Sequence, residues 1–587
     1  IMKLRKHLIM AVTSVITFTS IGSVSVFSKT YPDSVYTITE DKSTAENLNS
    51  LLDFLTRGGV DENTDFDTDM NQDGSINVYD YILMKRQLLT KNVQGEFTDS
   101  AWKATDDNVK LMGRNVILND VTWLVQSGSA AEFSVTGKSA EIVLKCNHVS
   151  SNKDHRSRYA IYADDALIAD DTMNNKEEKI TLFSEDSSVT KNIRIILLSE
   201  AMYGAVGVES INVNSCAETP VKPLPKKNLS IEFIGDSITC AYGVEGTSSS
   251  DAFKTTTENF TKSYAYLTAQ KLNADYSAVC YSGHGIVSGF SSGDKNSDSL
   301  IPPVYDINSK VSPFNTDWDF DSQKHDVVVI NLGTNDHNYV TADIETRSEE
   351  FIDGYVNFLK TIREKNPDAF IICTMGTMGG EETCELVNEA VKLYADDTKD
   401  SRVTYYKSAL QNVNDGLGSD WHPSEVTQLK SAYVLADKIC QVLGIESDQV
   451  GLDMAANAVY DVDINTENGA NAAFYVGYDK SFWINMVTGG TQDNDIVAYL
   501  SEIPLKKDGE YRLEFDYTTT VDRDITVSVE GNDIYFSDTI KSSAEKQHFI
   551  GTFKASEDDS SANITFNIGG IDSYNVTLSN ISLIKTA

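Results

Sequence analysis

The stretch Ile231–Gly243, IEFIGDSITCAYG, changes character at its centre. An apolar run ends at Gly235, and the chain then presents Asp236, Ser237 and small residues. In an open α/β sheet the carboxyl ends of the strands form the edge where ligands bind. Ser237 is therefore a candidate nucleophile, but serine is also a preferred N-cap of a following helix. Taken alone, the Gly-Asp-Ser turn favours capping, because such turns are common.

Apolar runs of this kind recur along the chain, and amphipathic segments separate them. The apolar runs are 229–235, 275–281, 325–333, 369–376 and 402–407, and the helical patterns cover 262–273, 348–366, 381–397 and 424–444. Short, nearly continuous apolar strands between amphipathic helices predict a parallel sheet with helices on both faces. We therefore expect residues 229–445 to form an α/β domain with Ser237 at the carboxyl edge of its sheet.

The segments on either side of this domain alternate apolar and polar residues. Residues 93–215 include AAEFSVTGKSAEIVLKC, and residues 450–587 include GEYRLEFDYTTT. Such alternation, broken by turn residues, predicts a β-sandwich (jelly-roll) domain on each side. The stretch 216–228 holds three of the ten prolines and is interpreted as a linker.

The composition restricts the class of protein. With 587 residues, the chain is long enough for about three or four domains. The formal net charge of −38 excludes nucleic acid as a partner, because so acidic a chain cannot neutralise a row of phosphates. The seven cysteines have no repeated spacing, so we expect buried thiols and no disulfide scaffold.

Residues 1–28 combine a basic head, an apolar middle and an end of small residues. This pattern predicts a secretory signal peptide, and hence an extracellular protein with no membrane segment after cleavage. A membrane anchor is the alternative, which the serines and threonines of the apolar run disfavour.

A twelve-residue loop, DMNQDGSINVYD, occupies positions 69–80. Its spacing fits a calcium loop, with Gly74 at the sharp turn and ligands at Asp69, Asn71, Asp73, Ser75 (through its carbonyl), Asn77 and Asp80. The surrounding segment, 36–92, resembles a type I dockerin, a module that binds a cohesin domain of a scaffoldin. Residues 36–60 lack a second set of ligands, so the first repeat is degenerate or the module is atypical. A purely structural calcium loop stays an alternative.

Three other stretches contain residues that could act together with Ser237. Gly283 and Gly285 lie in the turn of VCYSGHGIV, Asn335 follows VVVINLG, and His422 precedes the last helical pattern. Ester hydrolysis needs a nucleophile, a base that takes its proton, and donors for the oxyanion. Ser237 and His422 supply the first two. The candidate donors are the Ser237 N–H, a glycine N–H of the turn and the Asn335 amide.

The order of these motifs, Gly-Asp-Ser, a glycine turn, GTND and His-Pro, resembles that of the SGNH (GDSL-like) hydrolases over residues 229–445. The N-terminal β segment and the ending DWHPS resemble carbohydrate esterase family two, whose members remove acetyl groups from plant cell-wall polysaccharides. The resemblance implies a three-layer, flavodoxin-like fold, no cofactor for catalysis, Ser237 as nucleophile and Gly285 as the oxyanion glycine. It also implies that Trp421 stacks on sugar, for which a place in the core is the alternative.

The residue that orients the base is left open. Asp420 stands two residues before His422, one fewer than is usual in the wider superfamily. Either the Asp420 carboxylate or a backbone carbonyl holds the imidazole. Asp236 is interpreted as a cap or brace of its turn.

The leading hypothesis is a secreted, cellulosome-attached serine esterase of the acetylxylan-esterase type, acting on acetylated xylan or glucomannan. The alternatives are a pectin or rhamnogalacturonan acetylesterase and a non-catalytic carbohydrate-binding protein. Residues 450–587 resemble carbohydrate-binding modules of the family-four type. In that domain Trp483 is either a sugar-stacking residue or part of the core.

Overall fold

The computed structural model describes residues 78, 80–83, 85, 96–456, 458–477 and 479–587. The predicted signal peptide and the calcium ligands Asp69 to Asn77 lie outside the described residues. Asp80, the last predicted ligand, lies buried in a short helical segment. The chain divides into two compact units, residues 1–97 with 216–218 and residues 98–215 with 219–587. In the part of the chain that the structure describes, no helix combines the length and apolarity needed to cross a membrane.

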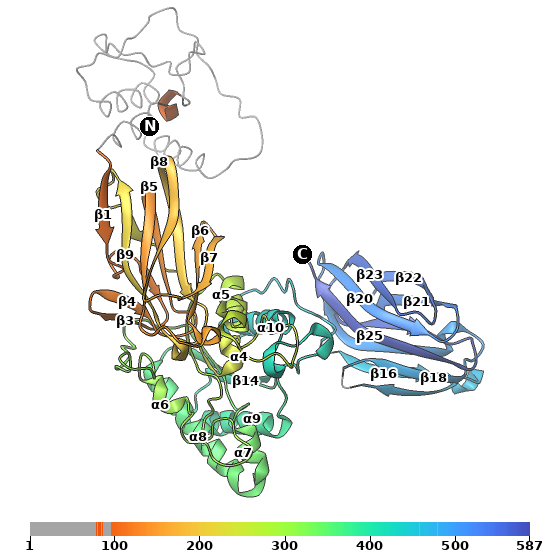
Figure 1. Cartoon of the computed structure of the whole chain (residues 1–587). Helices are drawn as coiled ribbons and strands as arrows, with labels where there is room; N and C mark the ends of the chain where they lie inside the picture. Colours follow the sequence, from red (N-terminus) through yellow and green to blue (C-terminus); the bar gives the residue numbers. More distant parts are fainter. Residues whose placement is uncertain (1–77, 79, 84, 86–95, 457, 478) are drawn as a thin grey trace, which may run out of the picture. The chain divides into compact units, whose positions relative to one another are not determined.

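The N-terminal β domain contains ten strands, and all their pairings are antiparallel. They are β1 (Thr98–Trp102), β2 (Lys110–Met112), β3 (Asn115–Leu118), β4 (Val121–Leu124), β5 (Ala130–Cys146), β6 (Arg158–Ala163), β7 (Ala166–Thr172), β8 (Glu177–Leu197), β9 (Val206–Ser215) and β10 (Val221–Pro223). The main path runs β3-β4-β9-β5-β8-β6-β7. Figure 1 shows the long neighbouring strands β9, β5 and β8. Register shifts within β5 let these strands continue through one hydrogen-bonded network in place of two separate sheets.

The predicted linker 216–228 is partly a strand. Val221–Pro223 forms β10 and pairs antiparallel with β5. The side chain of Val221 is buried in the core of the N-terminal domain, which explains why this short segment is held on the sheet. Pro223 is tolerated because it lies at the end of an outer strand, where no ladder donor is required of it.

The central domain is built on five parallel strands in the order β12-β11-β13-β14-β15. The strands β11 (Ser230–Gly235), β12 (Asp275–Cys280), β13 (Val327–Asn331), β14 (Phe370–Met375) and β15 (Val403–Lys407) lie within the five predicted apolar runs. The helices are α4 (Ser237–Cys240), α5 (Tyr264–Lys271), α6 (Pro302–Tyr305), α7 (His337–Ala342), α8 (Ile344–Lys365), α9 (Glu381–Thr398) and α10 (Glu425–Leu443). Each strand pairing is parallel.

Helices cover both faces of this sheet. Side chains of α8 and α9 pack with Ile234, Ile330 and their neighbours on one face. Side chains of α5 and α10 pack with Phe233 and Val329, which point to the other face. Because successive residues of a strand point to opposite faces, a strand buried on both sides has to be apolar throughout.

The N-terminal domain and the central domain share a core. Met112, Ala130, Ala160, Ile196 and Leu198 of the β domain belong to the same buried cluster as the α5–α10 face of the sheet. The expected burial of cysteines in apolar runs is confirmed for Cys146, Cys280, Cys373 and Cys440; Cys240 and Cys384 are buried as well, and all seven thiols are free.

A buried ion pair also joins these two domains. Arg114, which follows β2, donates to the carbonyl oxygens of Tyr305 and Ile307, each at 2.5 Å. Its guanidinium also lies 3.4 Å from the carboxylate of Glu232, which accepts the Tyr305 hydroxyl at 2.7 Å. Removing one partner of such a buried pair typically costs about 3–5 kcal/mol, because the other charge stays buried. Specific polar contacts as well as apolar packing therefore hold the two domains together.

The C-terminal domain is a sandwich of two five-stranded antiparallel sheets (Figure 1). One sheet contains β16 (Val459–Ile464), β19 (Ile496–Leu505), β24 (Asp559–Asn567), β21 (Arg523–Glu530) and β22 (Ile534–Ser542), and the other contains β17 (Asn471–Val476), β18 (Phe482–Thr488), β25 (Tyr574–Lys585), β20 (Glu510–Thr519) and β23 (Gln547–Lys554). One apolar core fills the space between them.

Trp483 does not belong to that core. Its side chain is 55% exposed on β18, and Tyr475, its partner in register on β17, is 57% exposed. The core alternative for Trp483 is therefore wrong. Two adjacent aromatic rings stand on the outer face of this sheet.

Candidate active site

Ser237 lies at the carboxyl end of β11, as predicted. A Cβ at Gly235 would lie 2.0 Å from Thr239 Oγ1, so only glycine allows this strand to turn at once into α4. The N-cap of α4 is Asp236, whose side chain accepts the Ile238 N–H at 3.0 Å. The capping interpretation of Ser237 is therefore wrong, and that of Asp236 is confirmed. Ser237 is the first residue of the helix, and its hydroxyl is available for other contacts.

The Ser237 hydroxyl contacts His422. Ser237 Oγ lies 2.9 Å from His422 Nε2. His422 Nδ1 lies 3.1 Å from the carbonyl oxygens of both Ser419 and Asp420. Because a carbonyl oxygen can only accept, Nδ1 carries the proton and Nε2 has the free lone pair. The imidazole is thus held in the tautomer that can take a proton from the serine hydroxyl.

The Asp420 carboxylate does not hold the imidazole, so Asp420 is not the orienting member of a Ser-His-Asp triad. Asp420 and Trp421 both adopt left-handed conformations, with φ of 49° and 65°. This turn aims the Asp420 carbonyl at the imidazole and its carboxylate elsewhere. The carboxylate accepts the Tyr242 hydroxyl at 2.9 Å. Of the two alternatives for orienting His422, the structure shows backbone carbonyls.

The environment of His422 favours the neutral ring. Burial lowers the pKa of His422 below its ordinary value, while the two carbonyl bonds and the charge of Asp420 oppose the shift. Tyr242 lies against the imidazole, with ring centroids 4.3 Å apart. A neutral imidazole is the form that accepts a proton, so these surroundings suit a general base.

The predicted oxyanion donors differ in whether their N–H groups already have acceptors. The Ser237 N–H belongs to the first turn of α4, where amides have no acceptor within the helix. The Asn335 amide donates to Asp236 Oδ2 at 3.1 Å and to the His284 carbonyl at 2.9 Å. These two bonds use both N–H groups of the amide, so the assignment of Asn335 to the oxyanion site is corrected. Asn335 instead ties the turn before Ser237 to the turn at His284.

Gly285 serves another purpose, and its assignment to the oxyanion site is corrected. Its N–H donates to the Ser299 carbonyl at 3.1 Å. A Cβ at Gly285 would lie 2.5 Å from the carboxylate of Asp336, which accepts the N–H groups of residues 286–288. The Ser288 carbonyl oxygen would be closer still, at 2.0 Å, so glycine is required here by the turn itself as well as by that carboxylate. Gly283, with φ of 75° and nothing within 4 Å of where a Cβ would lie, is the open glycine of the turn.

Two buried carboxyl groups stand behind the site. Burial raises the pKa of Asp236 to about 7 and that of Asp336 to about 6. In both cases bonds from backbone N–H groups oppose the rise. Both groups hold turns of the site through these bonds.

Trp421 is 62% exposed beside the base, so the core alternative for this residue is also wrong. Sequence reasoning missed Tyr242, although it lies in the opening stretch, five residues after Ser237. No local sequence pattern marks Tyr242, because its role depends on a contact with Asp420, which is distant in the sequence.

The chain is similar to several known hydrolases. Residues 231–435 match the family model of the GDSL-like Lipase/Acylhydrolase. Cellulase/esterase CelE of Acetivibrio thermocellus is 37% identical over 227 residues, which cover 38% of this chain and 26% of that protein. An acetylxylan esterase / glucomannan deacetylase of Cellvibrio japonicus is 23% identical over 347 residues, 58% of this chain and 90% of that protein. The chain thus spans about a quarter of the first curated relative.

A solved structure of a family two carbohydrate esterase from Clostridium thermocellum, in complex with cellohexaose, is also similar. It is 29% identical with a TM-score of 0.52, and the match covers 57% of this chain and 99% of that one. These similarities and the Ser237–His422 contact support a serine ester hydrolase whose relatives are carbohydrate esterases.

The lowered pKa of His422 predicts where activity falls in acid. Because burial keeps the imidazole neutral, kcat/KM should stay near its plateau down to a pH below about 6.5, the ordinary value for histidine. A pH profile on an acetyl ester measures this. Asp236, with a pKa of about 7, is the control: a limb near pH 7 that disappears in Asp236→Asn belongs to that residue. A limb at or above 6.5 that persists in this variant contradicts the role given to His422.

The geometry at Asp420 predicts unequal losses. Asp420→Asn keeps an acceptor for Tyr242 and the backbone carbonyl, so kcat/KM should fall by no more than about tenfold. His422→Ala removes the base and should cost about 10²–10⁴. Tyr242→Phe is the matched variant, since it removes the contact with the Asp420 side chain but leaves the backbone carbonyls that hold His422, and its loss should also be no more than about tenfold. Equal losses for Asp420→Asn and His422→Ala would show a triad.

Proposed function

We propose that this chain is a secreted carbohydrate esterase that removes O-acetyl groups from acetylated xylan or glucomannan through a serine acyl-enzyme. The observation that carries the proposal is the 2.9 Å contact between Ser237 Oγ and His422 Nε2 at the carboxyl edge of a parallel sheet. Relatives named acetylxylan esterase / glucomannan deacetylase support the class of substrate.

The contact implies a sequence of proton transfers. His422 Nε2 takes the Ser237 proton as Oγ attacks the acetyl carbonyl, and the Nδ1 bonds to two carbonyls stabilise the imidazolium. The oxyanion forms beside the Ser237 N–H at the start of α4. As the bond between the acetyl carbon and the sugar oxygen breaks, His422 gives the proton to that oxygen, and the sugar leaves with a free hydroxyl. A water molecule, deprotonated by the same nitrogen, releases acetate and restores the serine.

Surface features favour a neutral polysaccharide over the alternatives. The exposed Trp421 ring lies next to His422, where a sugar face can stack on it. The net charge of −38 opposes a polyanion such as pectin, so a pectin or rhamnogalacturonan acetylesterase is the weaker candidate. A non-catalytic binding protein is disfavoured by the intact serine–imidazole contact.

The flanking modules belong to the same proposal. The exposed pair Tyr475 and Trp483 of the C-terminal sandwich supports a sugar-binding role for that domain. The calcium loop of residues 69–80 supports a dockerin-like module that binds calcium and a cohesin of a scaffoldin. The N-terminal pattern of residues 1–28 supports secretion, and catalysis itself needs no cofactor in this scheme.

The substrate is tested by acetate release from acetylated xylan, glucomannan and pectin. The two neutral polysaccharides should release acetate faster than pectin. Ser237→Ala should abolish release without unfolding the protein, because only one oxygen is lost. Ser322→Ala, which changes an exposed serine elsewhere in the central domain, is the matched control. Substantial turnover by a folded Ser237→Ala variant would exclude the acyl-enzyme route.

Calcium removal should affect the dockerin-like module and not the esterase domain. EDTA or Asp69→Ala should abolish calcium binding, measured by titration calorimetry, and binding to a type I cohesin, because a loop of carboxylates folds only around its ion. Ester hydrolysis should be unchanged. Loss of hydrolysis on chelation would mean that a metal takes part in the reaction.

A further inference from the structure

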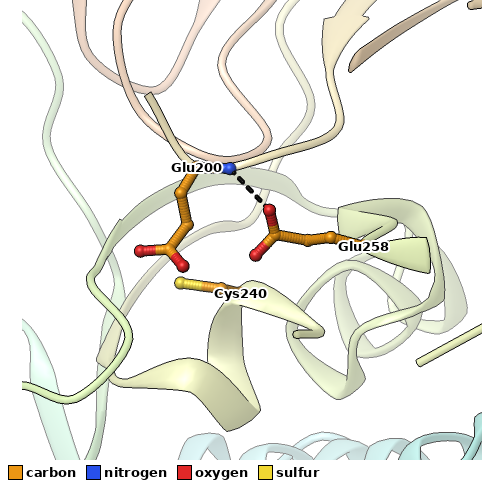
Figure 2. A group of neighbouring side chains, drawn as sticks. All are labelled: Glu200, Cys240 and Glu258. Atoms are coloured by element: carbon orange, nitrogen blue, oxygen red, sulfur yellow. Dashed lines mark hydrogen bonds between the residues drawn. The ribbon is translucent and has the colours of Figure 1, made fainter. Parts of the chain in front are cut away.

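Three buried acidic groups meet at the interface between the N-terminal and central domains (Figure 2). Glu200 lies between β8 and the short helix Ala201–Tyr203, Cys240 ends α4, and Glu258 follows the short helix Thr255–Thr257. Each is at most 1% exposed. One carboxylate oxygen from each glutamate and the Cys240 sulfur all lie within 4.8 Å of one another.

These groups are connected to the turn that carries Ser282. The Glu200 N–H donates to Glu258 Oε2 at 2.9 Å, which Figure 2 shows as a dashed line. The Glu200 carboxylate in turn accepts the Ser282 N–H at 2.8 Å with one oxygen and the Ser282 hydroxyl with the other. Glu258 therefore holds Glu200, and Glu200 holds Ser282 by two bonds.

The connection continues from Ser282 to the catalytic serine. His284 Nδ1 donates to the Ser282 carbonyl at 2.9 Å, and Lys310 Nζ lies 2.7 Å from His284 Nε2. The His284 carbonyl accepts the Asn335 amide, which also donates to Asp236 beside Ser237. Glu200 of the N-terminal domain is thus linked, through Ser282, His284 and Asn335, to Asp236, which caps the helix that begins at Ser237.

The two glutamates differ in how their oxygens are satisfied. Both oxygens of Glu200 accept hydrogen bonds, whereas Glu258 Oε1 is buried without a hydrogen-bond partner among the described residues. In Figure 2 this side of Glu258 faces Glu200 and Cys240. Burial and the charge of Glu200 raise the pKa of Glu258 well above its ordinary range. Burial also raises the pKa of Glu200, but the bonds from Ser282 oppose that rise.

We propose that Glu200 is a positioning residue of the active site, and that a proton carried by Glu258 allows Glu200 to stay ionised and hold the Ser282 turn. Two carboxylates so close together and fully buried cannot both be charged. A proton on the unpaired oxygen of Glu258 turns that oxygen into a hydrogen-bond donor, and the Glu200 carboxylate is the acceptor nearby. The proposal rests on the proposed esterase reaction, in which Asn335 links this turn to Asp236 beside the nucleophile Ser237.

Other titratable groups face the pair and have to be considered. They are Asp236, Cys240, Cys280, Tyr203, Tyr242 and Lys310. They are present in the wild type and in every variant described next. A comparison between variants therefore isolates the Glu200–Glu258 pair.

The positioning role is tested by kinetics on one acetyl ester. In Glu200→Gln one accepting oxygen is replaced by an NH₂ group that faces a donor of Ser282, so kcat should fall by about 10–100-fold with little change in KM. Glu258→Ala should lower kcat similarly, and Glu258→Gln should restore most of it, because its amide donates to Glu200 permanently. Glu245→Gln is the matched control: Glu245 pairs with Arg158 at the same interface, so the variant should lose stability without this loss of kcat.

The proton is tested by thermal unfolding as a function of pH. A carboxyl group whose pKa is raised by folding stabilises the protein below its unfolded pKa, and this stability is lost as the pH rises through the folded pKa. Glu258→Gln has no such proton to lose, so its Tm should gain on that of the wild type as the pH rises from 5 to 9. A constant difference would overturn the assignment of the proton. A divalent cation found by elemental analysis in the wild type, and lost in Glu258→Gln, would also overturn it.

The kinetic experiment and the thermal-unfolding experiment test different parts of the proposal. Wild-type kcat in Glu200→Gln overturns the positioning role. If Glu200→Gln does not fold, Ser282→Ala decides in its place, since it removes one of the two bonds and should lower kcat by about three- to tenfold; unchanged kcat again overturns the role. If the wild type hydrolyses no ester, the proposed function fails, while the Tm arm still decides whether the pair holds a proton.

Discussion

The contact between Ser237 Oγ and His422 Nε2 depends on two backbone turns that lie 185 positions apart in the sequence. At the first, the absence of a side chain on Gly235 lets β11 pass directly into α4. At the second, the left-handed conformations of Asp420 and Trp421 aim carbonyl groups at Nδ1. Main-chain geometry thus sets both the position and the tautomer of the candidate base, whose Nδ1 contacts two carbonyl oxygens.

The N-terminal domain contributes to the same arrangement. It shares a core with one face of the parallel sheet, and Arg114 places a buried charge next to Glu232 of β11, the strand that leads to Ser237. Buried charges are costly unless they are paired, so these contacts define one relative placement of the two domains. Through Glu200 the same interface reaches the turn at Ser282. Domain packing and the geometry of the site are therefore coupled.

Several features of the site were predictable because they depend on local patterns. The five apolar runs located the strands of the parallel sheet. Ser237 and Asn335 were found because they closely follow strand ends, and His422 because it precedes the last helix. Gly285 was assigned wrongly to the oxyanion site, because nothing in its sequence neighbourhood shows that the Ser299 carbonyl takes its N–H. Glu200 was missed for a similar reason, since it lies in the other domain and has no motif of its own.

The sequence by itself determined the order of the elements and indicated the candidate nucleophile and base, because periodicity and short motifs act over a few residues. It left open whether Asp420 or a carbonyl holds His422, and whether Trp421 and Trp483 lie in a core or on a surface. Only the tertiary structure decided these points. The direction of a side chain or a carbonyl depends on φ and ψ at a turn and on the partners that packing brings near, and Asp420 turned toward Tyr242 is the clearest case.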